Sequence, residues 1–276
     1  MLFIDARGTG GMISITTQKD AGKIRDLSFC YICGIDFQES DSKNLDHVPP
    51  KSIFAKPDRD FPLKFTTHKD QCHSPMNLDD EVISQLFALI HGKQPSEKND
   101  KLKIGVYQRT ETGAIMASFS ERNIEILLRR WLKGFHAALY REPLDENTRF
   151  AIQTPFPSGV KKDDQFIDAP IKEQHYEFVE CIKKNRAIGK LDCIQSNNGR
   201  LRYECVWDKL SNGSWSCIFA LNLYDWKNLG DINNFKARGC AGMYSPPNGK
   251  APNNAALATQ LEFRFENLDE ADPFGL

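Results

Sequence analysis

Four side chains of the kind that binds soft metal ions lie between residues 30 and 72. Cys30 and Cys33 are separated by two residues and Gly34 follows directly, which suits a tight knuckle whose thiolates reach one tetrahedral ion at about 2.3 Å. Cys72 adds a third thiolate, and His68 can add an imidazole from the same turn. We therefore predict a structural Zn²⁺ site of Cys30, Cys33, His68 and Cys72. Two alternatives stay open: the fourth ligand is another group, or the pair is simply two half-buried thiols in a turn.

A carboxylate and an imidazole lie on adjacent residues between the two halves of this set. A strand would point Asp46 and His47 to opposite faces, which allows them separate roles. The carboxylate can hold a hard cation such as Mg²⁺, and the imidazole can take a proton from water at neutral pH. Pro49 and Pro50 predict a rigid, extended loop after His47. His73 is well placed to be the second protein ligand of the cation. The alternative for the Asp-His pair is an exposed polar pair in a turn.

The segment from Ser28 to Phe87 resembles the HNH endonuclease family, in its cysteine-containing branch, through the box Asp46-His47-Val48-Pro49-Pro50-Lys51. The resemblance implies a ββα-metal fold, in which a two-stranded ribbon and a helix grip one divalent ion. By motif, it implies that Asp46 is a metal ligand and that His47 is the general base. It also implies that His73 is the closing histidine, which binds the same ion as Asp46.

The chain departs from the family pattern at two places. The family usually has a second cysteine pair, and Lys69 stands where the first cysteine of that pair would be, so that His68 substitutes for it. The central asparagine has no clear counterpart near residues 62–66. By contrast, relatives in this branch often carry Asn where this chain has His73, so the closing position here is nearer to the standard pattern.

The resemblance implies metal-dependent hydrolysis of phosphodiester bonds in DNA, with Mg²⁺ or Mn²⁺ as the catalytic ion and 5′-phosphate and 3′-hydroxyl products. The choice between DNA and RNA stays open. Roles in phage defence, restriction or a mobile element all fit an HNH endonuclease. The alternative is a catalytically inactive, zinc-stabilised protein that binds nucleic acid or serves as a scaffold. A third reading is nuclease activity that appears only inside a larger complex.

Composition limits the class of protein and its partners. The chain has 276 residues, eight cysteines and a net charge of −1, so we expect a cytoplasmic protein whose thiols stay free or bind metal. No apolar stretch approaches the roughly 20 residues that a membrane helix needs, so we expect no membrane contact. With so little net charge, affinity for DNA must come from local basic patches. We expect backbone phosphate contacts from Lys51, Lys56, Arg129 and Arg130. A homodimer is consistent with this reaction, because cleavage of both strands needs two active sites or two visits by one, and the choice between nicking and double-strand cutting stays open.

The pattern along the chain predicts an α+β protein in three parts. These are a lead-in segment over residues 1–27, an HNH module stabilised by zinc over 28–94, and a larger mixed α+β domain over 95–276. The last part would select the substrate or bind a protein partner. Periodicity predicts helices over 79–91, 121–139 and 172–184, short strands within 102–118 and over 150–154, and a hairpin over 201–223. We read His136 as a satisfied interior histidine, and the five cysteines after residue 180 as buried thiols.

Overall fold

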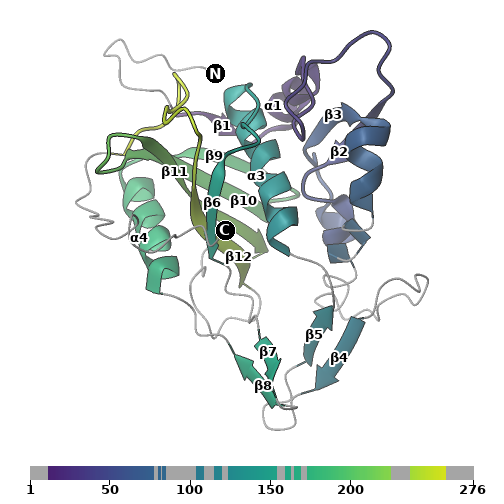
Figure 1. Ribbon diagram of the computed structural model, residues 1–276, viewed down its shortest axis with the longest axis vertical. Helices are drawn as coiled ribbons and strands as arrows, with labels where there is room; N and C mark the ends of the chain where they lie inside the picture. The colour runs from purple at the N-terminus through teal and green to yellow at the C-terminus, as the bar shows by residue number, and fades with distance from the viewer. Residues whose placement is uncertain are drawn as a thin grey trace.

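The chain forms a mixed α+β structure built around one six-stranded sheet, shown in the computed structural model of Figure 1. The strand order is β1-β9-β10-β11-β12-β6, and all neighbours are antiparallel except β1 and β9. The strands are β1 (Ser14–Ile15), β6 (Arg149–Gln153), β9 (Asp192–Ser196), β10 (Leu201–Lys209), β11 (Trp215–Tyr224) and β12 (Ala237–Ser245). The structure describes residues 12–77, 80–81, 83–84, 104–108, 115–119, 124–153, 159–162, 165–168, 173–224 and 237–258.

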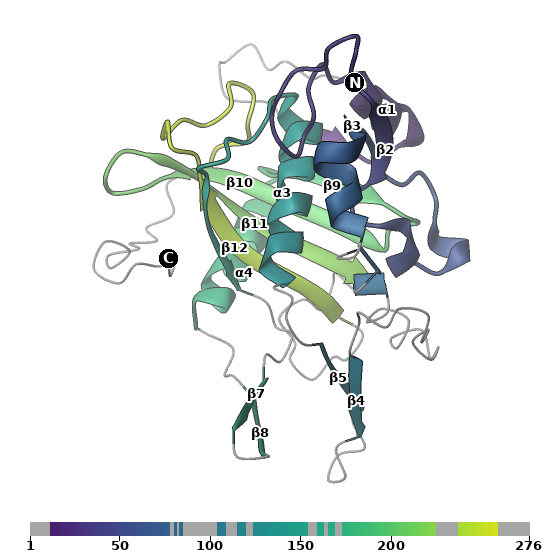
Figure 2. The same ribbon diagram turned by 45° about the vertical axis from the view of Figure 1, so that its right-hand side comes forward.

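Two helices cover the two faces of this sheet. Helix α3 (Ile124–Tyr140) packs its apolar side chains against strand residues such as Trp207 and Phe219. Helix α4 (Glu173–Ala187) packs against the residues directly before these two, Val206 and Ile218. Because consecutive strand residues point to opposite faces, the two helices lie on opposite sides of the sheet, as Figures 1 and 2 show.

A second, two-stranded sheet carries the residues that the sequence singles out. Strand β2 (Lys43–His47) pairs antiparallel with β3 (Lys64–His68), and Asp46 lies opposite Phe65. Short 3-10 turns at Lys51–Ile53 (η2) and Lys56–Asp58 (η3) fill the connection between the strands. After β3 the chain makes a π-helical turn, η4 (Lys69–His73), and a 3-10 turn, η5 (Ser74–Met76). The described residues Asn77, Asp80, Glu81, Ile83 and Ser84 are helical.

The β2–β3 region and the large sheet share one hydrophobic core. Val48 and Phe65 belong to the same buried cluster as Phe135 of α3. The closest approach is at Gly134, where an added Cβ would lie 2.9 Å from Cγ1 of Val48 and 3.4 Å from Cε2 of Tyr31. Figures 1 and 2 show α3 between β2–β3 and the strands of the large sheet. The boundary predicted at residues 94 and 95 therefore separates two parts that pack directly on each other.

The amino-terminal lead-in is partly built into this core. It contains β1, the helix α1 (Gln18–Lys23) and the 3-10 turn η1 (Ile24–Asp26). Ile15 and Ile24 are buried in the main cluster. Two further hairpins pair β4 (Ile104–Gln108) with β5 (Ile115–Phe119) and β7 (Gly159–Lys162) with β8 (Gln165–Asp168).

Most of the predicted elements are confirmed where the structure describes them. The strands within 102–118, the long helix ending near residue 139, strand β6, helix α4 and the β10–β11 hairpin all form. His136 is buried and its Nδ1 lies 3.1 Å from the Tyr244 hydroxyl, as expected for a satisfied interior histidine. The cysteines after residue 180 are free, and all except the half-buried Cys193 are buried. Strands β7, β8, β9 and β12 were not predicted. Among the described helices, none combines the length and apolar character needed to cross a bilayer.

Candidate metal centre and active site

Four side chains form a candidate metal centre at the end of β3. Their ligand atoms all lie within 4.8 Å of one another, and the residues are the predicted Cys30, Cys33, His68 and Cys72. The knuckle closes because Gly34 adopts φ +77° and its N–H donates to the Cys30 carbonyl at 2.8 Å. His68 ends β3, and Cys72 follows in η4. A cluster of three thiols and one imidazole could hold a structural metal such as zinc.

An acidic side chain supports the histidine of this cluster. His68 Nδ1 lies 3.4 Å from Cys33 Sγ, and its Nε2 lies 3.1 Å from Asp41 Oδ2. Asp41 is itself held by the backbone N–H of Gln38 at 2.7 Å, and this hydrogen bond, followed by the contact with His68, lowers the pKa of Asp41. A carboxylate on the second nitrogen is the usual support of a metal-binding histidine. Nδ1 is therefore the nitrogen available to the metal.

The surroundings of two of the cluster thiols favour their protonated form in the absence of a cation. Burial raises the pKa of the Cys72 thiol, and the neighbouring Cys30 thiol adds to this effect. Burial likewise raises the pKa of Cys33. Zinc, when bound, supplies the positive charge that lets such thiols deprotonate. Helix α3 places the Lys133 side chain near the knuckle, where its Nζ donates to the Ile32 carbonyl at 3.0 Å.

Next to this cluster, Asp46 is held in a buried position on β2. Its side chain is 3 % exposed, and the Tyr31 hydroxyl donates a hydrogen bond to its Oδ2. Burial and the Asp46 charge raise the pKa of Tyr31 well above its usual range, so the phenol stays protonated as a donor. The other carboxylate oxygen, Oδ1, lies 4.0 Å from Nε2 of His73. The structure thus brings two of the predicted site residues, Asp46 and His73, together.

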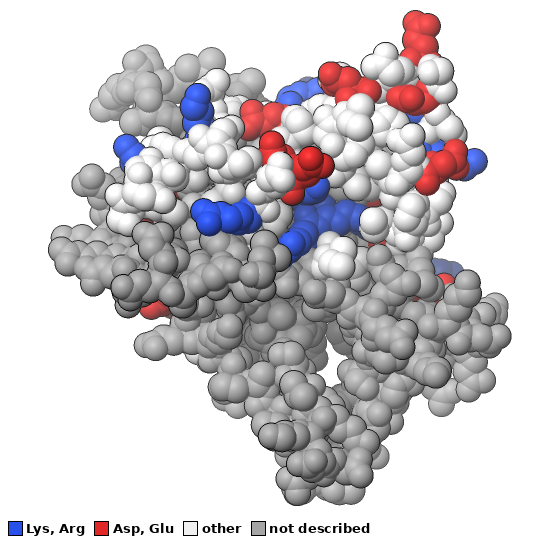
Figure 3. Space-filling model, viewed as in Figure 1, with Lys and Arg blue, Asp and Glu red and all other residues white. Residues whose placement is uncertain are grey.

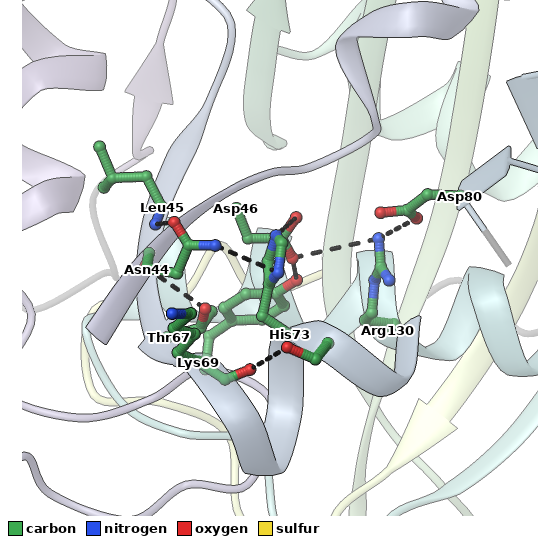
Figure 4. A network of polar contacts seen from close by, with 10 residues as sticks. Asn44, Leu45, Asp46, Thr67, Lys69, His73, Asp80 and Arg130 are labelled. Atoms are coloured by element: carbon green, nitrogen blue, oxygen red, sulfur yellow. Dashed lines mark hydrogen bonds and ion pairs between the residues drawn. The ribbon is translucent and has the colours of Figure 1, made fainter. Parts of the chain in front are cut away.

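Two consecutive residues of the turn η4 belong to two different clusters, and this arrangement brings His73 close to Asp46. Cys72 belongs to the metal centre, whereas His73 faces Asp46 (Figure 4). His73 Nδ1 lies 3.3 Å from Nδ2 of Asn44, and Asn44 Oδ1 accepts a 2.8 Å hydrogen bond from the Leu45 N–H. Asn44 and Asp46 share a face of β2 because they are two residues apart. The ring of His73 is therefore held between them.

An arginine from α3 completes this network and differs from what the sequence predicts. Arg130 is 4 % exposed, forms an ion pair with Asp80, and places Nη2 4.0 Å from Oδ2 of Asp46 (Figure 4). Its Nε and Nη1 atoms are buried without a hydrogen-bond partner among the described residues. We expected Arg130 to contact DNA phosphate from the surface, but its guanidinium is buried between two carboxylates. The residue before it, Arg129, is half-buried with its guanidinium 5.4 Å from the Phe150 ring centre.

His47 stands apart from the Asp46–His73 pair. It is the last residue of β2 and is half-buried. Burial, followed by the charges of Lys51 and Lys64, lowers the pKa of His47 below its usual value. Its imidazole forms no hydrogen bond or ion pair with any residue in the described part of the chain. The predicted general base is thus neutral at pH 7, and it is not joined to the other two predicted catalytic residues.

The predicted phosphate contacts differ in exposure. Lys51 and Lys56 are exposed, in the turns η2 and η3. Figure 3 shows Lys and Arg side chains gathered on one face of the molecule, between α3 and the β2–β3 side. Asp and Glu side chains lie directly beside them in the same view, in keeping with the small net charge of the whole chain.

The sequence did not lead us to expect three residues, Asn44, Tyr31 and Arg130, in the network around Asp46. Asn44 could have been found, because the period of two in a strand puts it on the same face as Asp46. Tyr31 lies between two predicted metal ligands, but nothing in the sequence indicates that its hydroxyl reaches residue 46. Arg130 comes from a helix far along the chain. Comparisons of this chain with protein-family models, with curated proteins and with solved structures found no match.

Proposed function

We propose that this chain is a metal-dependent endonuclease of the HNH type, which hydrolyses phosphodiester bonds of DNA. The observation that carries the proposal is the 4.0 Å separation between Asp46 Oδ1 and His73 Nε2, beside a cluster of three cysteines and one histidine. Strands β2 and β3 and the helical residues after them supply the order of elements that a zinc-stabilised ββα-metal module requires. The resemblance of the Asp46–Lys51 box to that family adds the reaction type.

Asp46 and His73 fit a shared hard divalent ion, Mg²⁺ or Mn²⁺. Two ligands on opposite sides of one ion, each at about 2.1 Å, are about 4.2 Å apart, and the separation of 4.0 Å lies just below this limit. The Tyr31 hydroxyl occupies Oδ2 of Asp46, which leaves Oδ1 for the ion. Such an ion, when bound, would neutralise charge on the phosphate and stabilise the leaving oxygen.

The chain's own residues would do the remaining chemistry. The His47 imidazole, whose pKa is lowered by burial and by Lys51, is unprotonated at neutral pH and can accept a proton from the attacking water. Arg130 would offset the charges of Asp46 and Asp80 behind the ion. The exposed Lys51 and Lys56 would hold the DNA backbone on the outside of the site.

The test is cleavage of supercoiled plasmid by the zinc-loaded chain with Mg²⁺ or Mn²⁺. We expect nicked or linear products, and we expect His47→Ala, Asp46→Asn and His73→Ala each to lower the cleavage rate at least about 100-fold. The zinc content of these variants should stay at that of the wild type. Glu180→Gln is the matched control, because Glu180 is exposed on α4 and contacts only Lys183 among the described residues.

One observation favours the alternative, a zinc-stabilised protein that binds nucleic acid or acts as a scaffold without cutting. A buried cation, Arg130, already lies 4.0 Å from Asp46, and the Tyr31 hydroxyl already satisfies the same oxygen. If the wild-type chain binds DNA but leaves the plasmid intact with either ion, the alternative holds and the nuclease proposal is wrong.

A further inference from the structure

The candidate metal centre and the Asp46 site are joined by one side chain. Tyr31 lies in the knuckle directly after the cluster residue Cys30, and its hydroxyl donates to Asp46 Oδ2. Its backbone is confined on both sides. Cys30 N–H donates to the Ile35 carbonyl at 2.9 Å, and the carbonyl of Ile32 accepts from Lys133. A metal bound by Cys30 and Cys33 would fix the same peptide units again.

The ring of Tyr31 is buried and packed on two sides. The residue is 1 % exposed, and its ring centre lies 4.8 Å from that of Phe65 on β3. On another side, Gly134 of α3 comes so close that an added Cβ would lie 3.4 Å from Cε2. With the backbone held by the knuckle and the ring held by packing, the hydroxyl points at one fixed position. That position is occupied by Oδ2 of Asp46.

Tyr31 competes with Arg130 for this carboxylate. The Arg130 Nη2 atom lies 4.0 Å from the same Oδ2 atom, beyond hydrogen-bond distance. Two further nitrogens of this guanidinium lack partners, so a freed carboxylate would gain a buried ion pair by turning toward it. The hydrogen bond from the phenol opposes this turn, and in the structure Oδ1 lies on the side of His73.

We propose that Tyr31 is a positioning residue, which ties the zinc cluster to the divalent-ion site by holding Asp46 away from Arg130 and toward His73. This inference rests on the proposed function, because it concerns the ion of that site. Residues that orient a metal ligand typically change metal affinity 10- to 100-fold when they are replaced. Tyr31→Phe, which keeps the packed ring and removes the hydroxyl alone, should therefore weaken Mn²⁺ binding by about 10- to 100-fold.

The experiment is calorimetric titration of the zinc-loaded full chain with Mn²⁺, for the wild type, Asp46→Asn, Tyr31→Phe and Tyr140→Phe. Tyr140→Phe is the matched control, because it also removes a buried hydroxyl from a buried carboxylate, that of Asp192. We expect Mn²⁺ binding to be lost in Asp46→Asn, weakened in Tyr31→Phe and unchanged in Tyr140→Phe. The zinc content should be equal in all four proteins. Raising the Mn²⁺ concentration should restore plasmid cleavage by Tyr31→Phe.

The two proposals fail in different ways in this experiment. If the wild type and Asp46→Asn bind Mn²⁺ alike, the ion does not use Asp46 and the proposed function is wrong. If binding depends on Asp46 but Tyr31→Phe matches the wild type, the nuclease site stands and the role of Tyr31 is overturned. Loss of zinc from Tyr31→Phe would also overturn it, because the hydroxyl would then serve the cluster rather than Asp46.

Discussion

The side-chain amide nitrogen of Asn44 lies 3.3 Å from Nδ1 of His73, and this contact determines which ring nitrogen carries hydrogen. The Asn44 Oδ1 atom is occupied by the Leu45 N–H, so the NH₂ group faces the ring. Nδ1 must then accept, which puts the proton of a neutral imidazole on Nε2, the atom nearest to Asp46. An ion that binds through Nε2 needs the opposite tautomer.

Replacing Asn44 by Asp should therefore tighten binding of Mn²⁺. A carboxylate can keep the bond to the Leu45 N–H with one oxygen and accept Nδ1–H with the other, which frees the Nε2 lone pair for the ion. We expect roughly a tenfold gain in affinity for Asn44→Asp, measured by calorimetric titration. Asn212→Asp, in the exposed β10–β11 turn, makes the same charge change and should have no effect. Weaker binding in Asn44→Asp would contradict this assignment of the hydrogen.

The affinity of the cluster for zinc should depend on Asp41. Its carboxylate contacts His68 Nε2 at 3.1 Å and favours the tautomer that leaves Nδ1 to the metal. We expect Asp41→Asn to weaken zinc binding by about 10- to 100-fold, measured by competition with a chromophoric chelator. Asp36→Asn removes an exposed carboxylate of the same knuckle that contacts Ser28 rather than a ligand, and it should leave zinc affinity unchanged.

Asp192 should make folding stability depend on pH in an unusual direction. Burial raises the pKa of Asp192 from 3.8 to about 6, and the Tyr140 hydroxyl, which donates to it, does not titrate in this range because burial raises the pKa of Tyr140 as well. Between pH 3.8 and about pH 6, the Asp192 carboxyl keeps its proton in the folded chain and loses it in the unfolded chain. The contribution of Asp192 to stability is therefore largest below pH 3.8 and falls, by about 3 kcal/mol in all, as the pH rises through about 6.

Asp192→Asn isolates this effect, because the amide does not titrate. The pH-dependent loss between pH 4 and 6 should be smaller in the variant than in the wild type, as measured by urea unfolding. The variant should also be less stable than the wild type by about 1–3 kcal/mol above pH 6, where the wild-type side chain is an ionised carboxylate. Asp192 accepts hydrogen bonds from Ile13, Tyr140 and Ala256, and an amide cannot accept all three. Identical pH profiles in the two proteins would refute the raised pKa.

The contact between α3 and the β2–β3 region should be sensitive to a single methyl group. Gly134→Ala gains about 1 kcal/mol of helix propensity, but the new Cβ would lie 2.9 Å from Val48, which is fully buried and stiff. We expect a net destabilisation of about 1 kcal/mol in thermal unfolding. Gly22→Ala, in α1, meets no atom within 4 Å and should be neutral or stabilising. Equal effects of the two substitutions would mean that α3 does not pack this closely.

The sequence indicates the ligands of the candidate metal centre because cysteine spacing restricts local geometry strongly. Cys30 and Cys33 must share a turn, and the strand period predicts that Asp46 and His47 point to opposite faces of the strand. The burial of Arg130 could not be predicted in this way. Its neighbours Asp46 and Asp80 are set by the packing of α3 on β2–β3, and an arginine on a helix gives the same local pattern whether it faces water or a carboxylate.

Local sequence patterns also do not predict all the strands of the large sheet. Strands β10 and β11 are long and joined by a tight turn with Gly213 at φ +86°, so the sequence identifies them. Strand β9 has only five residues, and β1 has two and pairs in parallel with a strand far along the chain. Short strands of this kind form because they pair with the edge of a neighbouring strand. The sequence of the short strand does not reveal which strand that neighbour is.

The pairing of β1 with β9 covers one edge of the large sheet, so the amino-terminal residues help to prevent aggregation. Ser14 and Ile15 cover the outer edge of β9, and Ile13 is anchored to the sheet by the Asp192 carboxylate. A chain shortened past Ile15 would leave the backbone N–H and C=O groups along that edge open to another molecule. Uncovered edges of this kind recruit strands from other chains and lead to aggregation.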